Sequence, residues 1–210
     1  LAEKFQTDIF DSQKFKRTLG LENKFVITYI GVHGLANHLI QLIDAAVLLE
    51  ETKIVFQLIG SGAQKEMLQA EVRKRNLKNV IFRDSVPKAE VFKYILASDV
   101  GVSVLKKAEV FKTIYSNKTF DYMACKKPVL LAIDGVSRAL IEEANCGFYV
   151  EPENSFLIAE KAKELLNLTD DTLIQIGENG FKFAKKNFDR KKLAIKYSSL
   201  IEKKIMLNEK

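Results

Sequence analysis

Lys118 and Asp121 carry the strongest chemical signal in the sequence. The segment that follows Ser116 has the pattern of a helix with Ser116 as its N-cap, which places the Lys118 ammonium in the first turn. A cation there opposes the helix macrodipole by about 0.3–1 kcal/mol, so an anion such as phosphate at the helix N-terminus would explain it. Asp121 lies on the same face and could accept hydrogen bonds from a ribose diol. Alternatively, the two side chains form a surface ion pair worth about 0.2–0.5 kcal/mol.

Glycines in loops that follow apolar runs form a second group of candidate residues. Gly31 and Gly34 follow the first run and precede a helical segment, whose N-terminal N–H groups could receive a phosphate. This loop is either a phosphate cradle or a plain turn, because both GxGxxG and GxxxxGK[ST] are absent. Gly60 and Val86 lie in the equivalent loops after the next two runs, which could also be simple turns. His33, alone in the first loop, is expected at the surface.

A long loop at residues 106–116 mixes charged and aromatic side chains, among them Glu109, Phe111, Lys112 and Thr113. Loops of this length in compact domains tend to be functional or mobile.

These candidates are positioned by alternating strands and helices. The apolar runs predict strands at residues 25–30, 54–59, 80–82, 100–105, 129–133 and 148–150, and the amphipathic segments predict helices at 37–51, 63–76, 88–97, 117–126 and 137–145. This alternation predicts an α/β fold, a Rossmann-like parallel sheet of about six strands with helices on both faces. Ligands in such sheets bind beyond the carboxyl ends of the strands, where all the candidate loops lie.

Three helical segments, at residues 154–168, 170–186 and 189–207, follow the last strand. Asp170 and Asp189 are the expected N-caps of the second and third. Apolar residues at helical spacing predict that the last helix docks one face on the body. We therefore expect one domain over residues 1–210, with 153–210 as its helical part.

The basic excess lies at the C-terminal end of the chain. Of 33 basic and 27 acidic residues, ten and three lie in residues 181–210, so the remainder carries one more acid than base. The lysines of the last helix form either a solvated surface or a peripheral contact with anionic lipid headgroups. No nucleic-acid motif accompanies them, so no nucleic-acid partner is expected.

The amino-acid composition restricts the class of protein further. The chain is 47% apolar and 29% charged, which is typical of a globular protein, and no apolar run reaches the roughly 18 residues of a membrane span. Two cysteines and two histidines at unrelated spacings indicate neither a disulfide framework nor a metal site, and they favour the cytoplasm. The chain begins at Leu1 without a signal peptide, so we expect a piece of a longer protein.

Several segments together resemble a known family. They are TYIG at 28–31, FQLIGSG at 56–62, VIFRDSVP at 80–87, ASDVGVS at 97–103, KTFDYMACKKPV at 118–129 and CGFYVEP at 146–152. In order and spacing, the chain resembles the C-terminal, donor-binding half of the GT-B retaining glycosyltransferases called group 1 or family 4. The resemblance implies a UDP-sugar as substrate, no cofactor and no metal. It also implies a glycan or lipid-linked acceptor and an N-terminal acceptor domain that this chain lacks.

The same resemblance assigns roles to residues. It implies that Gly60 and the Val86 neighbourhood contact the base, Asp121 the ribose and Lys118 the diphosphate. The segment 105–118 is similar to a subgroup that transfers N-acetylated amino sugars in bacterial surface polysaccharide synthesis, where Phe111 to Thr113 would help to hold the donor.

Three departures from the family pattern stand out. Thr113 lies where the first acid of the family's E-x7-E pair is expected, and Glu109 is four residues earlier. Val32 and Asn37 replace the usual arginine and lysine of the first loop, and Asp121 is one methylene shorter than glutamate. Two alternatives therefore stay open: a GT-B UDP-sugar epimerase, and a nucleotide-binding or structural module without catalysis. We expect the isolated chain to bind donor without transferring sugar, and no residue in it is assigned as catalytic.

Overall fold

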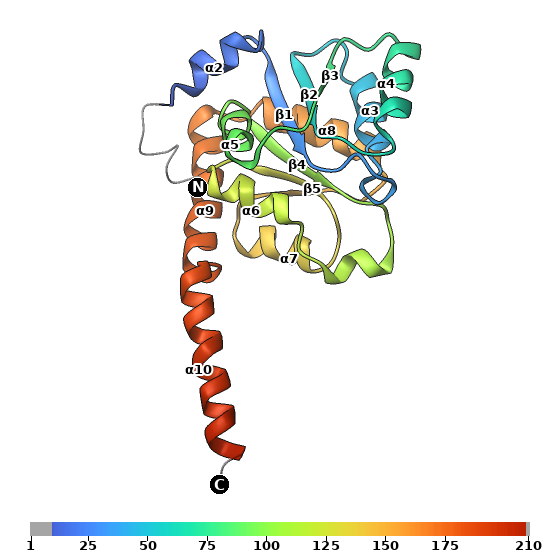
Figure 1. Ribbon diagram of the computed structural model, residues 1–210. Helices are drawn as coiled ribbons and strands as arrows, with labels where there is room; N and C mark the ends of the chain where they lie inside the picture. The colour runs from blue at the N-terminus through green and yellow to red at the C-terminus, as the bar shows by residue number, and fades with distance from the viewer. Residues whose placement is uncertain (1–9, 209–210) are drawn as a thin grey trace.

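The computed structural model describes residues 10–208 and contains the six predicted strands in one parallel sheet (Figure 1). The strands are β1 Phe25–Ile30, β2 Ile54–Ile59, β3 Val80–Arg83, β4 Val100–Val104, β5 Val129–Ala132 and β6 Gly147–Tyr149. Their order across the sheet is β3-β2-β1-β4-β5-β6, and every neighbouring pair is parallel. The α/β, Rossmann-like prediction is confirmed.

The helices cover both faces of the sheet (Figure 1). They are α2 Ser12–Thr18, η1 Leu35–Asn37, α3 Ile40–Val47, α4 Lys65–Lys74, α5 Lys88–Leu96, η2 Glu109–Thr113, α6 Asn117–Ala124, α7 Val136–Glu143, α8 Ser155–Leu166, α9 Asp170–Asn187 and α10 Arg190–Asn208. Helices α3, α4 and α8 pack in one core cluster, and α5, α6, α7 and α9 pack in the other. Alternate residues of a strand serve the two faces, as Leu130 and Leu131 of β5 do.

The chain order creates a crevice beside the central strand β1. The chain runs outward from β1 through β2 to β3 and then returns to place β4 on the other side of β1. Ile27 of β1 is in register with Phe56 of β2 on one side and with Val100 of β4 on the other. In open parallel sheets such a reversal marks the ligand site.

The first predicted helix, residues 37–51, is interrupted near its start. His38 has the left-handed conformation with φ 46°, which separates η1 from α3. The preceding helix α2 was not predicted. It is attached to the body by an ion pair, 2.7 Å long, between the buried Lys16 and the partly buried Asp99.

The prediction that the last helix docks on the body is wrong. Helix α10 extends beyond the sheet (Figure 1), and its apolar side chains from Leu193 to Ile201 are 43–69% exposed. Helix α9 already covers α6, so α10 continues past that edge. Asp189 begins α10 as predicted, with Oδ1 accepting from the Lys192 amide at 3.0 Å, but Thr169 rather than Asp170 caps α9. The Lys203 and Lys204 side chains, part of the predicted basic surface, lie outside the described residues.

Candidate functional site

Tyr122 fixes helix α6 at the reversal of strand order. Its buried hydroxyl donates to the Val102 carbonyl at 3.1 Å and accepts from the Ile30 amide at 3.2 Å, which ties α6 to both β4 and β1. Gly101 makes room for the ring, because a Cβ there would overlap it. The N-terminus of α6 is therefore held between the loops that follow β1 and β4.

Ser116 occupies the N-cap position of α6, as predicted, but its hydroxyl does not cap the helix. The hydroxyl instead shares a hydrogen bond with Ser103 at 2.7 Å, and the Ser116 amide donates to Ser137 at 3.2 Å. These contacts tie the start of α6 to β4 and α7. The first turn of α6 lacks a side-chain cap, which suits an anion site.

Lys118 projects from this first turn toward the glycine loop after β1. Its Nζ lies 4.9 Å from the centroid of the Tyr29 ring, and a Cβ on Gly31 would lie 3.3 Å from its Cε. Burial lowers the pKa of Lys118 to about 8, although the charge of Asp121 acts in the opposite direction. No carboxylate of the described residues forms an ion pair with it. Lys118 is thus a partly buried positive charge that lacks a counterion.

Asp121 pairs with Lys88 and not with Lys118. The Lys88 ammonium, at the start of α5, lies 2.5 Å from Asp121 Oδ2. The surface ion pair considered for Lys118 and Asp121 is therefore not formed. Lys88 was not among the residues predicted from the sequence, although it lies in the first turn of α5, two residues after Val86, as Lys118 lies in the first turn of α6.

The two glycine loops after β1 and β2 are in direct backbone contact. Gly60 and Gly62 have φ of 147° and 151°, a region that favours glycine, and a Cβ on either would overlap or press on the first loop. The His33 amide donates to the Ser61 carbonyl at 2.8 Å, and its carbonyl accepts from Gln64 at 2.9 Å. The contact holds both loops as one wall of the crevice.

His33 is buried beneath these loops, so the expectation of a surface histidine is wrong. Its ring lies 6.0 Å from the rings of Tyr29 and Phe82, and neither ring nitrogen makes a hydrogen bond of good geometry. Burial and the positive charge of Lys65 lower the pKa of His33 to about 4, against a smaller opposing effect of the Ile59 backbone. The glycines let the two loops close over the His33 ring. Burial of this kind cannot be predicted from the spacing of residues in the sequence.

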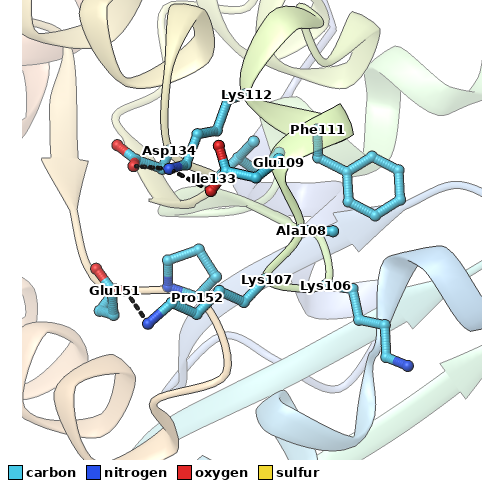
Figure 2. A pocket seen from close by; sticks show the side chains of 10 residues that line it. All are labelled: Lys106, Lys107, Ala108, Glu109, Phe111, Lys112, Ile133, Asp134, Glu151 and Pro152. Atoms are coloured by element: carbon cyan, nitrogen blue, oxygen red, sulfur yellow. Dashed lines mark ion pairs between the residues drawn. The ribbon is translucent and has the colours of Figure 1, made fainter.

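Seven of the ten predicted site residues line three hollows at the carboxyl ends of the strands, whereas Thr113, Lys118 and Asp121 line none of these hollows. Gly31, Gly60 and Val86 are brought together in one of about 180 Å³, whereas Gly34 lines a separate hollow of about 260 Å³ beside α3 and α4. A third, of about 410 Å³, is lined by ten residues (Figure 2): Lys106, Lys107, Ala108, Glu109, Phe111, Lys112, Ile133, Asp134, Glu151 and Pro152.

The positions that depart from the family pattern have different surroundings. Thr113 is exposed, and its hydroxyl donates to the Val110 carbonyl at 3.1 Å, so it lines none of these three hollows. Val32 is 63% exposed, and Asn37 is also exposed. The first loop therefore offers backbone but no cationic side chain at these two positions.

The sequence comparisons identify the family. Residues 11–183, most of the chain, match the family described as "Glycosyl transferases group 1". The chain belongs to this family. Among curated protein sequences, none matched.

Several solved structures have the same fold as this chain. HepE from Anabaena, in complex with UDP and glucose, has a TM-score of 0.81 and 20% identity over 93% of this chain and 53% of its own length. The sucrose-phosphate synthase of Thermosynechococcus elongatus has a TM-score of 0.79 and 18% identity, over 93% of this chain and 49% of that chain. This group 1 glycosyltransferase chain therefore spans about half the length of these structures.

A third similar structure is that of an isolated domain. The C-terminal domain of a group 1 glycosyltransferase, LpcC from Francisella tularensis, has a TM-score of 0.72 and 21% identity over 86% of this chain and 94% of its own. The architecture of the chain is therefore that of one half of a GT-B fold.

No group of three or more histidine, cysteine, aspartate or glutamate side chains within residues 10–208 could hold a metal ion. In the same range, every helix is too short or too polar to cross a membrane.

Proposed function

We propose that the chain is the donor-binding half of a retaining glycosyltransferase that moves a sugar from a UDP-sugar to a glycan or lipid-linked acceptor. The observation that carries the proposal is the Lys118 ammonium, which forms no ion pair with a carboxylate of the described residues and points from the α6 N-terminus to the glycine loop. A protein that keeps a partly buried cation without a carboxylate partner gains from it when an anion arrives. A nucleoside diphosphate supplies that anion.

Each part of the nucleotide has a proposed place. The base occupies the hollow between Gly60 and Val86, where backbone groups of two loops are accessible. The ribose hydroxyls bind Asp121, which Lys88 orients, and the diphosphate lies against Lys118 and the first turn of α6. During transfer, Lys118 and the helix N-terminus would stabilise the departing diphosphate, and the acceptor hydroxyl would attack the same face of the sugar.

The rest of the proposal concerns the complete protein. An N-terminal domain of the same polypeptide supplies the acceptor side, no cofactor or metal takes part, and the protein works in the cytoplasm. The sugar is proposed to be an N-acetylated amino sugar for a bacterial surface polysaccharide, held by Phe111, Lys112 and Thr113. Loss of the usual cations at Val32 and Asn37 favours the alternative of a module without catalysis, and a GT-B epimerase is the second alternative.

Calorimetric titration with UDP and with NAD tests the nucleotide site. We expect UDP to bind more tightly, and Lys118→Met to weaken UDP by the value of a charge-assisted hydrogen bond, about 1.5–3 kcal/mol or roughly 10- to 150-fold. Lys74→Met is the matched control, because its 78% exposed side chain lies on α4 away from the hollow. If UDP and NAD bind equally, or if Lys118→Met leaves the UDP affinity unchanged, the proposed nucleotide site is refuted. A chelator should leave UDP binding unchanged.

We also propose that α10 contacts an anionic bilayer. The exposed Leu193, Tyr197, Leu200 and Ile201 recur at helical spacing, and Lys192 and Lys196 lie beside them. Exposed apolar side chains can insert among lipid headgroups and lysines attract anionic lipids, so both kinds of residue support this contact. Co-sedimentation with vesicles containing 30% phosphatidylserine should exceed that with pure phosphatidylcholine vesicles, and a Lys192→Gln, Lys196→Gln double variant should reduce it. Equal recovery with both vesicle types would reject the contact.

A further inference from the structure

Lys65, the first residue of α4, joins the loops that follow β2 and β3. Its ammonium donates to the Gly60 carbonyl at 2.8 Å, to the Arg83 carbonyl at 3.0 Å and to Asp84 Oδ1 at 2.8 Å. A lysine ammonium has three protons, so all of its donor capacity is used here. The Lys65 side chain is only 14% exposed, which shields the two bonds to backbone carbonyls from water.

The three partners of Lys65 differ in how firmly they can hold it. The Asp84 side chain is fully exposed, so water screens this ion pair and it contributes little by itself. The carbonyls of Gly60 and Arg83 belong to the backbone at the ends of two adjacent strands, and hydrogen bonds from a charged donor are stronger than those between neutral groups. The link between the two loops therefore depends mainly on these carbonyls.

The same contacts fix the peptide group between Gly60 and Ser61. The Gly60 amide donates to the Arg83 carbonyl at 3.2 Å, so both polar backbone groups of Gly60 are bound. The C=O and N–H of a trans peptide point in opposite directions, so the Ser61 N–H points away from the Lys65 ammonium. Within residues 10–208 this N–H has no hydrogen-bond acceptor, and Ser61 lines the hollow beside Gly60 and Val86. Lys65 thus gives a free donor at this hollow a fixed direction.

The hollow between the two loops is small. Its volume of about 180 Å³ lies below the roughly 300–1,000 Å³ of small-molecule pockets. Ser61 and Ser85, one from each loop, line it, and the Ser85 hydroxyl donates to the Ser61 hydroxyl at 2.9 Å. Both serines are exposed, so water can replace this bond. The separation of the loops, and with it the width of the hollow, therefore rests on Lys65.

We propose that Lys65 is a positioning residue that makes the nucleotide site select a one-ring base over a two-ring base. This inference rests on the proposed function, which places the base between Gly60 and Val86. With both loops held by Lys65, the hollow has a width that a pyrimidine fits and that the second ring of a purine exceeds. Lys65 does not touch the nucleotide and acts through the backbone of Gly60 and Arg83.

Calorimetric titration with UDP, GDP and ADP tests this role, because the three ligands share the ribose and the diphosphate and differ only in the base. Wild type should bind UDP at least about tenfold more tightly than GDP or ADP. Lys65→Met keeps an apolar stem and removes the ammonium, so it should weaken UDP binding and reduce the preference for UDP to less than about threefold.

Two further variants serve as controls. Asp84→Asn removes the exposed ion pair but keeps both bonds from Lys65 to the carbonyls, so each affinity should stay within twofold of wild type. Lys118→Met should weaken all three ligands by the same factor, because the diphosphate is common to them. A change in the ratio of affinities is therefore specific to the loops around the base.

The ratio of UDP to GDP affinity decides the outcome. The proposal is overturned if Lys65→Met keeps the wild-type ratio, or if wild type binds the three nucleotides equally. Lys65→Gln, with a shorter polar side chain, gives the same test if Lys65→Met does not fold; if neither variant folds by circular dichroism, Lys65 serves the whole fold and its role in base selection is rejected. Absence of nucleotide binding to wild type removes the proposed function and this inference with it, whereas UDP binding with an unchanged ratio removes only the role of Lys65.

Discussion

Replacement of Lys118 by methionine should stabilise the protein while it weakens UDP binding. The side chain keeps its length and apolar stem, so contact with Tyr29 and Gly31 is largely retained. What disappears is a charge that burial disfavours, since the pKa of Lys118 falls from 10.5 to about 8 on folding. Stability and binding should therefore change in opposite directions.

The size of the stabilisation follows from that pKa. The lower pKa in the folded chain corresponds to a gain in unfolding free energy of about 3 kcal/mol at pH 7 when the charge is removed. This value is an upper limit, because the variant also loses a cation–π contact with Tyr29 worth about 1 kcal/mol. Between pH 8 and 10.5 the unfolded chain binds more protons than the folded chain, so wild-type stability rises with pH in this window. The advantage of Lys118→Met should then shrink by about 1 kcal/mol between pH 7 and 9.

Urea unfolding at pH 7, 8 and 9 measures both quantities for wild type, Lys118→Met and the control Lys74→Met. The control should differ from wild type by a few tenths of a kcal/mol at every pH, because its side chain is exposed. The reasoning about Lys118 is refuted if Lys118→Met is less stable than wild type at pH 7, or if the difference between them does not change with pH.

Three further substitutions test the scaffold that positions the site, each by urea unfolding. Gly101→Ala should cost at least about 1–3 kcal/mol, because the new methyl overlaps the Tyr122 ring; a change below 0.5 kcal/mol would contradict that packing. Asp99→Asn should cost about 3 kcal/mol, because it leaves the buried Lys16 ammonium without a carboxylate, and an unchanged midpoint would argue against the pair. The pKa of His33 is lower in the folded chain than in the unfolded chain, so between pH 7 and 5 the unfolded chain binds more protons and the wild type loses about 2 kcal/mol of unfolding free energy. His33→Leu should remove this loss. Parallel pH profiles for the two proteins would count against burial of a neutral ring.

The sequence predicts the sheet well because its strands are buried on both faces. Short apolar runs rich in β-branched and aromatic residues, such as Phe25–Ile30 and Ile54–Ile59, favour strands over helices, and both strands occur with the predicted bounds. The docking of α10 on the body was predicted wrongly because its apolar pattern says nothing about a partner surface. Periodic apolar residues show that a face can be buried, but not that the described part of the chain provides a surface against it.

Some features of the site could be predicted from the sequence, and others could not. The neighbourhood of Gly31, Gly60 and Lys118 follows from their places after strands, because parallel strands bring their carboxyl ends together. The pairing of Asp121 with Lys88 depends on side chains 33 residues apart in sequence, and burial of His33 depends on backbone contact between two loops. Local spacing contains neither kind of information.

The electrostatics of the sheet edge changes from one end to the other. Near β1 and β2, the hollow beside Gly60 and Val86 is lined by apolar side chains, glycines and serine hydroxyls. At the reversal of strand order, Lys118 provides a positive charge that no carboxylate of residues 10–208 pairs with in the described structure, and beyond it the hollow at β4 to β6 contains ion pairs. A ligand that matches this edge has a flat neutral group, an anionic centre and a hydroxylated neutral end, in that order. A nucleotide sugar has this order of groups, which supports the proposal that the chain binds a UDP-sugar along this edge.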